Sequence, residues 1–203
     1  MKKLPLILIL FGTIFSSFCQ EKTKDPIDQI KTFQEHLNEE YRSPEESPLS
    51  EEERLAFKGH DFYEIDTSFI VEATFVRTAL ESPFRMQTSS DRQPIYVKYA
   101  DLYFTLKGKE LKLAVYQSQT LKDDPKYFDY LFLPFTDDTN GKGSYAGGRY
   151  IDLKIPKEGT KEIILDFNKA YNPYCAYSGG YSCPVPPTEN NLDLKISAGV
   201  KAY

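Results

Sequence analysis

The stretch of this chain with the most chemical potential runs from residue 137 to residue 149. It is rich in glycine and polar side chains, and it lies between two runs that alternate between apolar and polar residues as strands do. Its beginning matches half of a calcium-binding loop, Thr136-x-Asp138-x-Asn140-Gly141. The first ligand would then be a threonine and the twelfth a glycine, whereas calcium needs several carboxylate oxygens. A calcium site therefore fits poorly, and we expect no metal.

The same stretch allows two other interpretations. Its glycines leave backbone N–H groups free to form an anion-binding nest beside Lys142 and Arg149, although a complete phosphate-loop motif is absent. Alternatively, it is a long hairpin turn in which Asp138 and Thr139 bond their own backbone. Turn chemistry alone explains the Asn-Gly and Gly-Gly pairs, so the turn is the preferred interpretation.

A second candidate site lies between residues 166 and 183. This segment follows a strand-like run and is rich in tyrosine and asparagine, with Asn168, Tyr171, Asn172, Tyr174 and Tyr177. Tyrosine rings supply contact area and amides supply hydrogen bonds, so such a loop suits a small polar ligand. The alternative is that these tyrosines only cover the open end of a barrel.

Two cysteines of this segment, Cys175 and Cys183, are predicted to form a disulfide, because they are an even pair in a chain that looks exported. Their separation differs from that of a Cys-x-x-Cys redox motif. A metal pair is less compatible with the sequence, since only His36 and His60 are available to complete it. The disulfide would brace the tyrosine-rich loop.

Evidence for catalysis is sparse. Ser144 and Ser178 lack the Gly-x-Ser-x-Gly surroundings of an esterase nucleophile. His60 is the better placed of the two histidines to act as a base, but its position at the start of a strand is typical of a structural residue. Asp138 and Glu189 offer a glycosidase-like carboxylate pair as an alternative, although the absence of tryptophan weakens a sugar-binding interpretation. Whether the protein is an enzyme stays open.

The chain begins with the pattern of a secretory signal peptide. Two lysines precede an apolar run over residues 4–15, which is shorter than the roughly 20 residues that span a bilayer. Small side chains at the −3 and −1 positions predict cleavage after Cys19, so residues 1–19 are the leader and residues 20–203 the mature chain. The alternative, a lipid on Cys19, favours a small preceding residue, and Phe18 is bulky. We therefore expect a periplasmic or secreted protein.

The composition argues against two kinds of partner. The chain has 30 acidic and 25 basic residues, a formal net charge of −5, and no basic block. Nucleic acid and anionic lipid are therefore not expected to bind. No second apolar run approaches the length of a membrane span, and the mature chain has the length of a single domain.

The helices expected from the sequence lie near the N-terminus. Asp25-Pro26 reads as an N-cap followed by proline at the first helical position. Apolar residues then recur at steps of three and four and predict an amphipathic helix over residues 26–41, namely Ile27, Ile30, Phe33, Leu37 and Tyr41. Ser50 and Glu53 predict a capping box for a short helix near residues 51–57.

From residue 61 onward the hydrophobic period changes to two, which indicates strands. Phe69, Val71, Ala73 and Phe75 would share one face of the first. Further strands are predicted over residues 95–99, 102–106, 111–116, 130–135, 149–155, 162–166 and 192–196, with a hairpin turn at Lys107-Gly108-Lys109. This spacing predicts a mainly β fold, an antiparallel β-sandwich or partly closed barrel with an N-terminal amphipathic helix.

Two long motifs give the chain a family resemblance. One spans residues 135–150 and contains Asp-Asp-Thr-Asn-Gly and Gly-Gly-Arg-Tyr; the other spans residues 166–190 and contains Asn-Pro-Tyr-Cys and Cys-Pro-Val-Pro-Pro. They resemble an uncharacterised bacterial family, domain of unknown function 1684, frequent in exported proteins of Bacteroidetes. The resemblance extends from Ser47 to the C-terminus, with Ala146 where the family usually has a further glycine. It implies no reaction.

These observations predict an exported β domain of the cell envelope that binds a small polar ligand or an envelope protein, without a cofactor. A carboxylate-dependent hydrolase is the alternative. The candidate ligand-binding residues are Asp138, Tyr145, Arg149, Asn172 and Glu189. The guanidinium of Arg149 suits a carboxylate, and a structural pair with Asp138, Asp166 or Glu189 is preferred over a ligand role.

Overall fold

The computed structural model describes residues 25–203, so the expected leader lies outside the described residues. The chain starts with helix α1 (Pro26–Arg42), whose N-terminus is capped by the Asp25 carboxylate accepting from the Ile27 amide. Helix α2 (Glu51–Ala56) begins at a complete capping box between Ser50 and Glu53. Both helices confirm the predictions from the N-cap signals and the apolar spacing. None of the described helices is long and apolar enough to cross a membrane.

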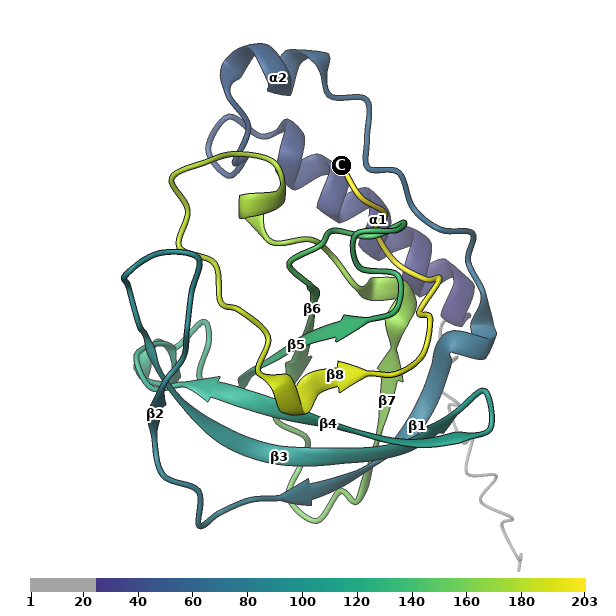
Figure 1. Ribbon diagram of the computed structural model, residues 1–203, viewed down its shortest axis with the longest axis vertical. Coiled ribbons are helices and arrows are strands. Elements are labelled where there is room, and N and C mark those ends of the chain that lie inside the picture. Colours follow the sequence, from purple (N-terminus) through teal and green to yellow (C-terminus); the bar gives the residue numbers. More distant parts are fainter. Residues whose placement is uncertain (1–24) are drawn as a thin grey trace, which may run out of the picture.

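A curled, mainly antiparallel sheet follows (Figure 1). Its strands are β1 (Ile70–Arg77), β2 (Phe84–Arg85), β3 (Ile95–Leu106), β4 (Lys109–Ser118), β5 (Tyr130–Asp137), β6 (Arg149–Lys154), β7 (Glu162–Asp166) and β8 (Asn191–Leu192). The strand order is β6-β5-β4-β3-β1-β7, with β2 paired to β3 and β8 paired in parallel to β5. The sheet curls into a half-barrel and leaves β6 and β7 as its two outer strands. Of the two architectures expected, the partly closed barrel is confirmed.

Three strand predictions need correction. Residues 95–106 form one strand rather than two, with a register irregularity at Lys98/Ala100. The expected strand over residues 192–196 is wrong: only Asn191–Leu192 is a strand, and it is parallel to β5. The two-residue strand β2 was not expected. Short segments carry too few alternating residues to reveal their pairing from sequence.

The two faces of the curled sheet have different chemistry. The inner face packs in an aliphatic and phenylalanine core that includes Ala73, Leu102, Leu113 and Leu133, with Phe167 from the turn after β7, all fully buried. The outer face of β3 to β6 carries an aromatic cluster instead, with Tyr96, Tyr116, Phe132 and Tyr150. Successive residues of a strand point to opposite faces, so β5 and β6 contribute to both layers. Because the outer face is also apolar, another part of the chain must cover it as well.

Helix α1 and the C-terminal segment supply part of that cover. Leu37 and Tyr41 of α1 pack with Leu49, Tyr177 and Val200 in a separate apolar cluster. Figure 1 shows the C-terminus beside α1, on the same side of the molecule as the loop that follows β7.

Asn190 holds the sheet together where β4 and β5 separate. These strands share a single register pair, Tyr116 with Phe132, and β8 pairs with β5 farther along. The fully buried Asn190 amide bridges the gap: Nδ2 donates to the Ala114 and Pro134 carbonyls at 2.8 and 2.7 Å, and Oδ1 accepts from the Ala114 amide at 2.8 Å. A side chain thus replaces ladder hydrogen bonds.

Candidate functional site

A cleft of about 570 Å³ lies on the outer face of β5 and β6. It is walled by α1 on one side and by the disulfide-containing segment after β7 on another. Its lining is mainly aromatic. It also includes His36 and Glu40 on α1, Arg92 in the loop before β3, and Asp152 on β6. A concave, largely apolar site with a few converging polar groups is the usual form of a small-molecule site.

The floor of the cleft is a chain of contacting rings. Tyr96 and Phe132 have ring centroids 5.8 Å apart, Phe132 and Tyr150 4.7 Å, and Tyr150 and Tyr171 5.8 Å. The last two pairs meet edge to face, an arrangement that stabilises aromatic pairs beyond their buried area. The rings of the floor therefore hold one another in place before any ligand is bound.

Asp152 lies on β6 at the edge of this floor. Its Oδ1 accepts hydrogen bonds from the Tyr130 hydroxyl at 2.7 Å and the Tyr171 hydroxyl at 2.8 Å. The carboxyl group is open to solvent through the cleft, yet protein surrounds it closely enough that desolvation raises its pKa, with a further contribution from the charge of Glu40; the two tyrosine hydrogen bonds act in the opposite direction. Burial and the Asp152 charge raise the pKa values of Tyr130 and Tyr171 well above the usual value, so both hydroxyls remain donors.

One wall of the cleft is a face of α1. Phe33, His36, Leu37, Glu40 and Tyr41 line it, at the three- and four-residue spacing of one helical face. The Glu40 carboxylate accepts a hydrogen bond from the Tyr174 hydroxyl, which joins α1 to the loop on the other side. Two parts of the cleft lining that are distant in sequence are thus joined directly.

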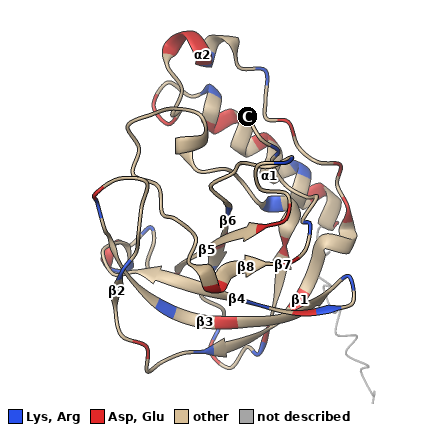
Figure 2. Ribbon diagram, in the orientation of Figure 1, with Lys and Arg blue, Asp and Glu red and all other residues tan. Residues whose placement is uncertain are grey.

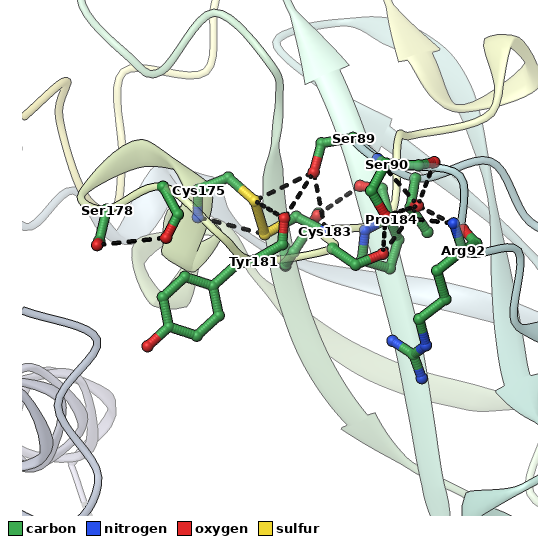
Figure 3. The surroundings of a disulfide bond; sticks show 12 residues. Ser89, Ser90, Arg92, Cys175, Ser178, Tyr181, Cys183 and Pro184 are labelled. Carbon is green, nitrogen blue, oxygen red and sulfur yellow. Dashed lines mark hydrogen bonds between the residues drawn. A yellow bond between two sulfur atoms is a disulfide. The ribbon is translucent and has the colours of Figure 1, made fainter.

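The other wall contains the disulfide. Cys175 and Cys183 are joined, as predicted. Ser89 accepts from the Cys183 amide at 3.0 Å and donates to the Tyr181 carbonyl at 3.2 Å, so the loop between β2 and β3 is attached to this wall. Figure 3 shows this network, with the Arg92 and Tyr181 side chains extending to the same side of the disulfide. The bridge braces the part of the chain that carries the cleft tyrosines.

Arg149, a predicted candidate, lies in the interior with no exposed surface. Its Nη2 pairs with Asp137 Oδ2 at 2.8 Å and donates to the Ile196 carbonyl at 2.8 Å, and Nη1 donates to the Ala198 carbonyl. The expected carboxylate partners Asp138, Asp166 and Glu189 are therefore wrong, and Asp137 takes their place. The guanidinium links the start of β6 to the C-terminal segment.

The other four candidates are not gathered with it. Asp138 is exposed, because it follows the inward-facing Asp137 on β5. The Glu189 carboxylate pairs with Lys98 at 2.9 Å and accepts from the Tyr116 hydroxyl at 2.7 Å. Tyr145 contributes its carbonyl to the Asn140 amide within the turn after β5. None of these lines the aromatic cleft.

Asn172 is almost fully buried beneath the tyrosine-rich loop. Its Nδ2 donates to the Tyr177 hydroxyl at 3.2 Å and to the Lys201 carbonyl at 2.8 Å. The loop itself does line the cleft through Tyr171, Tyr174 and Tyr181. Sequence reasoning thus located one of the right segments, and it missed Asp152, which reads from sequence as an ordinary polar position in a strand.

The turn between β5 and β6 is held by its own side chains. Asp137 Oδ1 accepts from the Thr139 amide, and the Asn140 Oδ1 accepts from the Asp137 amide. The bonding carboxylate is therefore Asp137, where Asp138 was expected. Within residues 25–203 no group of three or more His, Cys, Asp and Glu side chains is arranged to hold a metal.

His60 packs among aromatic rings outside the cleft. Its ring centroid lies 4.3 Å from that of Tyr41 and 5.4 Å from that of Tyr177, and Nδ1 lies 3.0 Å from Asn38 Oδ1. Burial, then the nearby charge of Arg42, lowers the pKa of His60 to about 4. The residue is a neutral packing element rather than a base in a site.

This depressed pKa predicts acid sensitivity. Above pH 6.5, the usual histidine value, His60 is neutral in the folded and the unfolded chain; between pH 6.5 and 4 only the unfolded chain binds the proton. Its contribution to stability therefore falls by up to about 1.4 kcal/mol per pH unit in this window. Chemical denaturation at several pH values measures the effect: as the pH falls, the free energy of unfolding should decrease less steeply for His60→Gln than for wild type. The control is His36→Gln, at an exposed position of α1, which should show the wild-type dependence of unfolding free energy on pH. The same pH dependence in all three proteins would show that His60 is not the source of the acid sensitivity.

Charge on the surface is mixed. Figure 2 shows acidic residues on α2, residues of both signs on α1, and basic residues spread over several elements.

The fold and the cleft define a class of small β-rich protein: a curled antiparallel half-barrel with an aromatic pocket on its outer face. A family model described as a protein of unknown function, DUF1684, matches residues 55–201. The chain therefore belongs to this family, which confirms the resemblance, although the match begins later than Ser47.

One solved structure is similar over most of both chains. It is the solution NMR structure of an uncharacterised protein of Haloarcula marismortui, 34% identical in sequence, with a TM-score of 0.67, and the match covers 86% of this chain and 93% of that chain. No curated protein matches. Neither the family description nor the name of this relative states a function, and the cleft is the feature of the fold that indicates one.

Proposed function

We propose that this protein is an exported β domain, residues 20–203 after cleavage, that binds a small molecule in the aromatic cleft. The observation that carries the proposal is the pairing of a preformed tyrosine floor with an Asp152 oxygen, Oδ2, that has no hydrogen bond or ion pair from residues 25–203. Small-molecule sites combine apolar walls with a few polar groups that fix orientation.

The size of the cleft supports a small ligand. Its volume of about 570 Å³ lies within the roughly 300–1,000 Å³ typical of such sites. The walls come from three separate parts of the chain, joined by the Ser89 hydrogen bonds to Cys183 and Tyr181 and by the Glu40–Tyr174 hydrogen bond, and the disulfide braces one of these parts. Preorganised walls reduce the ordering cost of binding.

The geometry favours binding over the hydrolase alternative. Hydrolysis by Asp138, Arg149 and Glu189 requires all three around one substrate, whereas Arg149 has no exposed surface and its carboxylate partner is Asp137.

The disulfide supports export, since such bonds persist in oxidising compartments. Mature protein isolated from its native host is expected to begin at Gln20 and to carry no lipid. N-terminal mass analysis checks this, and a lipidated Cys19 would contradict the cleavage without affecting the cleft.

Binding is tested by protein-observed NMR with a panel of small aromatic compounds that includes cationic, neutral and anionic members. Saturable shifts are expected in amides of β5, β6 and residues 171–184. A panel that leaves these amides unperturbed, or perturbs only other regions, would overturn the binding proposal.

A further inference from the structure

The buried carboxylates of the described chain, Asp101, Asp137 and Asp166, each have a cationic partner, whereas the more exposed Asp152 on the cleft floor has none. Asp137 pairs with Arg149 at 2.8 Å, Asp101 with Lys98 at 2.9 Å, and Asp166 with Lys169 at 3.9 Å. No lysine, arginine or histidine within residues 25–203 comes within ion-pair distance of Asp152. A carboxylate closely surrounded by protein is stabilised mainly by an opposite charge and by hydrogen bonds.

The two hydrogen bonds that Asp152 does receive leave one side of it vacant. Tyr130 and Tyr171 both donate to Oδ1, at 2.7 and 2.8 Å. Oδ2 therefore keeps its full capacity to accept from a ligand. The same two tyrosines, with Tyr96 and Tyr150, line the cleft together with Asp152.

Tyrosine rings attract cations as well as apolar groups. The negative face of an aromatic ring attracts an ammonium group, and aromatic cages bind organic ammonium ions. A charge-assisted hydrogen bond from the ammonium to Oδ2 would add direction to that attraction. The floor of the cleft thus offers both elements of a cation site, a carboxylate and aromatic rings, with apolar area for the rest of the molecule.

Resting on the binding function proposed above, we propose that the cleft selects an organic cation, an amine on an aromatic or apolar body, and seats its ammonium group against Asp152 Oδ2. The rings of Tyr96 and Tyr150 contact the body of the ligand. Glu40, on the α1 wall, adds negative potential, while Arg92 and His36 line other parts of the cleft. Desolvation and the Glu40 charge raise the pKa of the Asp152 carboxyl group, and a bound ammonium offsets both effects.

Three probes that share a phenylethyl body test this selection: 2-phenylethylamine, its neutral N-acetyl derivative and the anion 3-phenylpropanoate. NMR titrations of the wild-type protein give a dissociation constant for each. The amine is expected to bind at least about tenfold more tightly than the neutral and anionic probes, the difference that one charge-assisted hydrogen bond supplies.

The site of discrimination is tested by Asp152→Asn. This variant keeps an oxygen for the Tyr130 and Tyr171 hydroxyls but removes the charge, so amine affinity should fall about tenfold and affinity for the neutral probe should persist. The matched control is Asp129→Asn, since Asp129 pairs with Lys154 at 3.1 Å and is not among the residues that line the cleft. It should bind all three probes as wild type does.

The outcomes separate the two proposals. If the neutral or anionic probe binds in the cleft as well as the amine, the small-molecule function stands and cation selection is wrong; preference for the anion would point to Arg92. If no probe shifts the cleft amides and the wider panel also fails, the binding function is wrong. Because the wild-type ranking needs no variant, a failure of Asp152→Asn to fold leaves the test intact.

Discussion

Replacing Arg149 by either lysine or alanine is expected to lower the free energy of unfolding by about 3–5 kcal/mol, the usual cost of breaking a buried ion pair on one side. Arg149 and Asp137 are both fully buried at the side chain and lie 2.8 Å apart. The same guanidinium binds the Ile196 and Ala198 carbonyls. Lysine cannot reproduce this fixed set of donors, and alanine leaves the Asp137 charge without its partner.

Chemical denaturation of the two variants measures the effect. The control is Arg85→Lys, because Arg85 lies on the exposed strand β2 and surface changes of this kind usually stay within about 0.5 kcal/mol. Wild-type stability in both Arg149 variants would show that the C-terminal segment does not depend on this pair. A lower free energy of unfolding in the alanine variant alone would show that the positive charge at position 149, rather than the geometry of the guanidinium, stabilises the fold.

Asn190→Ala and Asn190→Asp are expected to destabilise the protein by at least about 3 kcal/mol, because each unsatisfied buried group costs roughly 1–3 kcal/mol. Alanine leaves the Ala114 amide and the Ala114 and Pro134 carbonyls without the partner they now have. Aspartate removes the donor and places a carboxylate against two carbonyl oxygens, so its effect should be the larger. The destabilisation should be greatest where β4 and β5 are no longer paired with each other.

Thermal and chemical denaturation measure this loss, with hydrogen exchange of the β4 and β5 amides as a local readout. Asn191→Asp is the control, since the neighbouring Asn191 is exposed and bonds only the Thr136 hydroxyl through its side chain. Equal stability of the Asn190 and Asn191 variants would mean that the β4–β5 gap does not need its amide bridge.

Much of the fold could be predicted because local signals and tertiary packing agree. Phe69, Val71 and Ala73 alternate toward the core as expected, and the Lys107-Gly108 turn has the positive φ values of 51° and 78° that a tight hairpin turn requires. The path of the C-terminal segment could not be predicted. Its strand β8 is two residues long, and its position depends on contacts with Arg149 and β5 that are distant in sequence.

The candidate site was predicted in part. The tyrosine-rich loop and its disulfide stood out by composition, and Tyr171 and Tyr174 do line the cleft. Arg149 stood out equally, but its charge serves the interior. Asp138 was chosen over Asp137 because sequence does not reveal which of two adjacent carboxylates faces inward when a strand ends in a turn.

The sequence by itself determined the helices, most of the strands, the disulfide pair and the family, because each depends on residues that are close in the chain or on a motif read directly. Only the tertiary structure decided the site. Asp152 on β6, Tyr130 on β5, Tyr171 after β7 and Glu40 on α1 are unremarkable in their own segments. Curling of the sheet and packing of α1 over its outer face bring these side chains around one cleft. The two tyrosines that bond the Asp152 carboxylate are 19 and 22 residues away from it in the sequence.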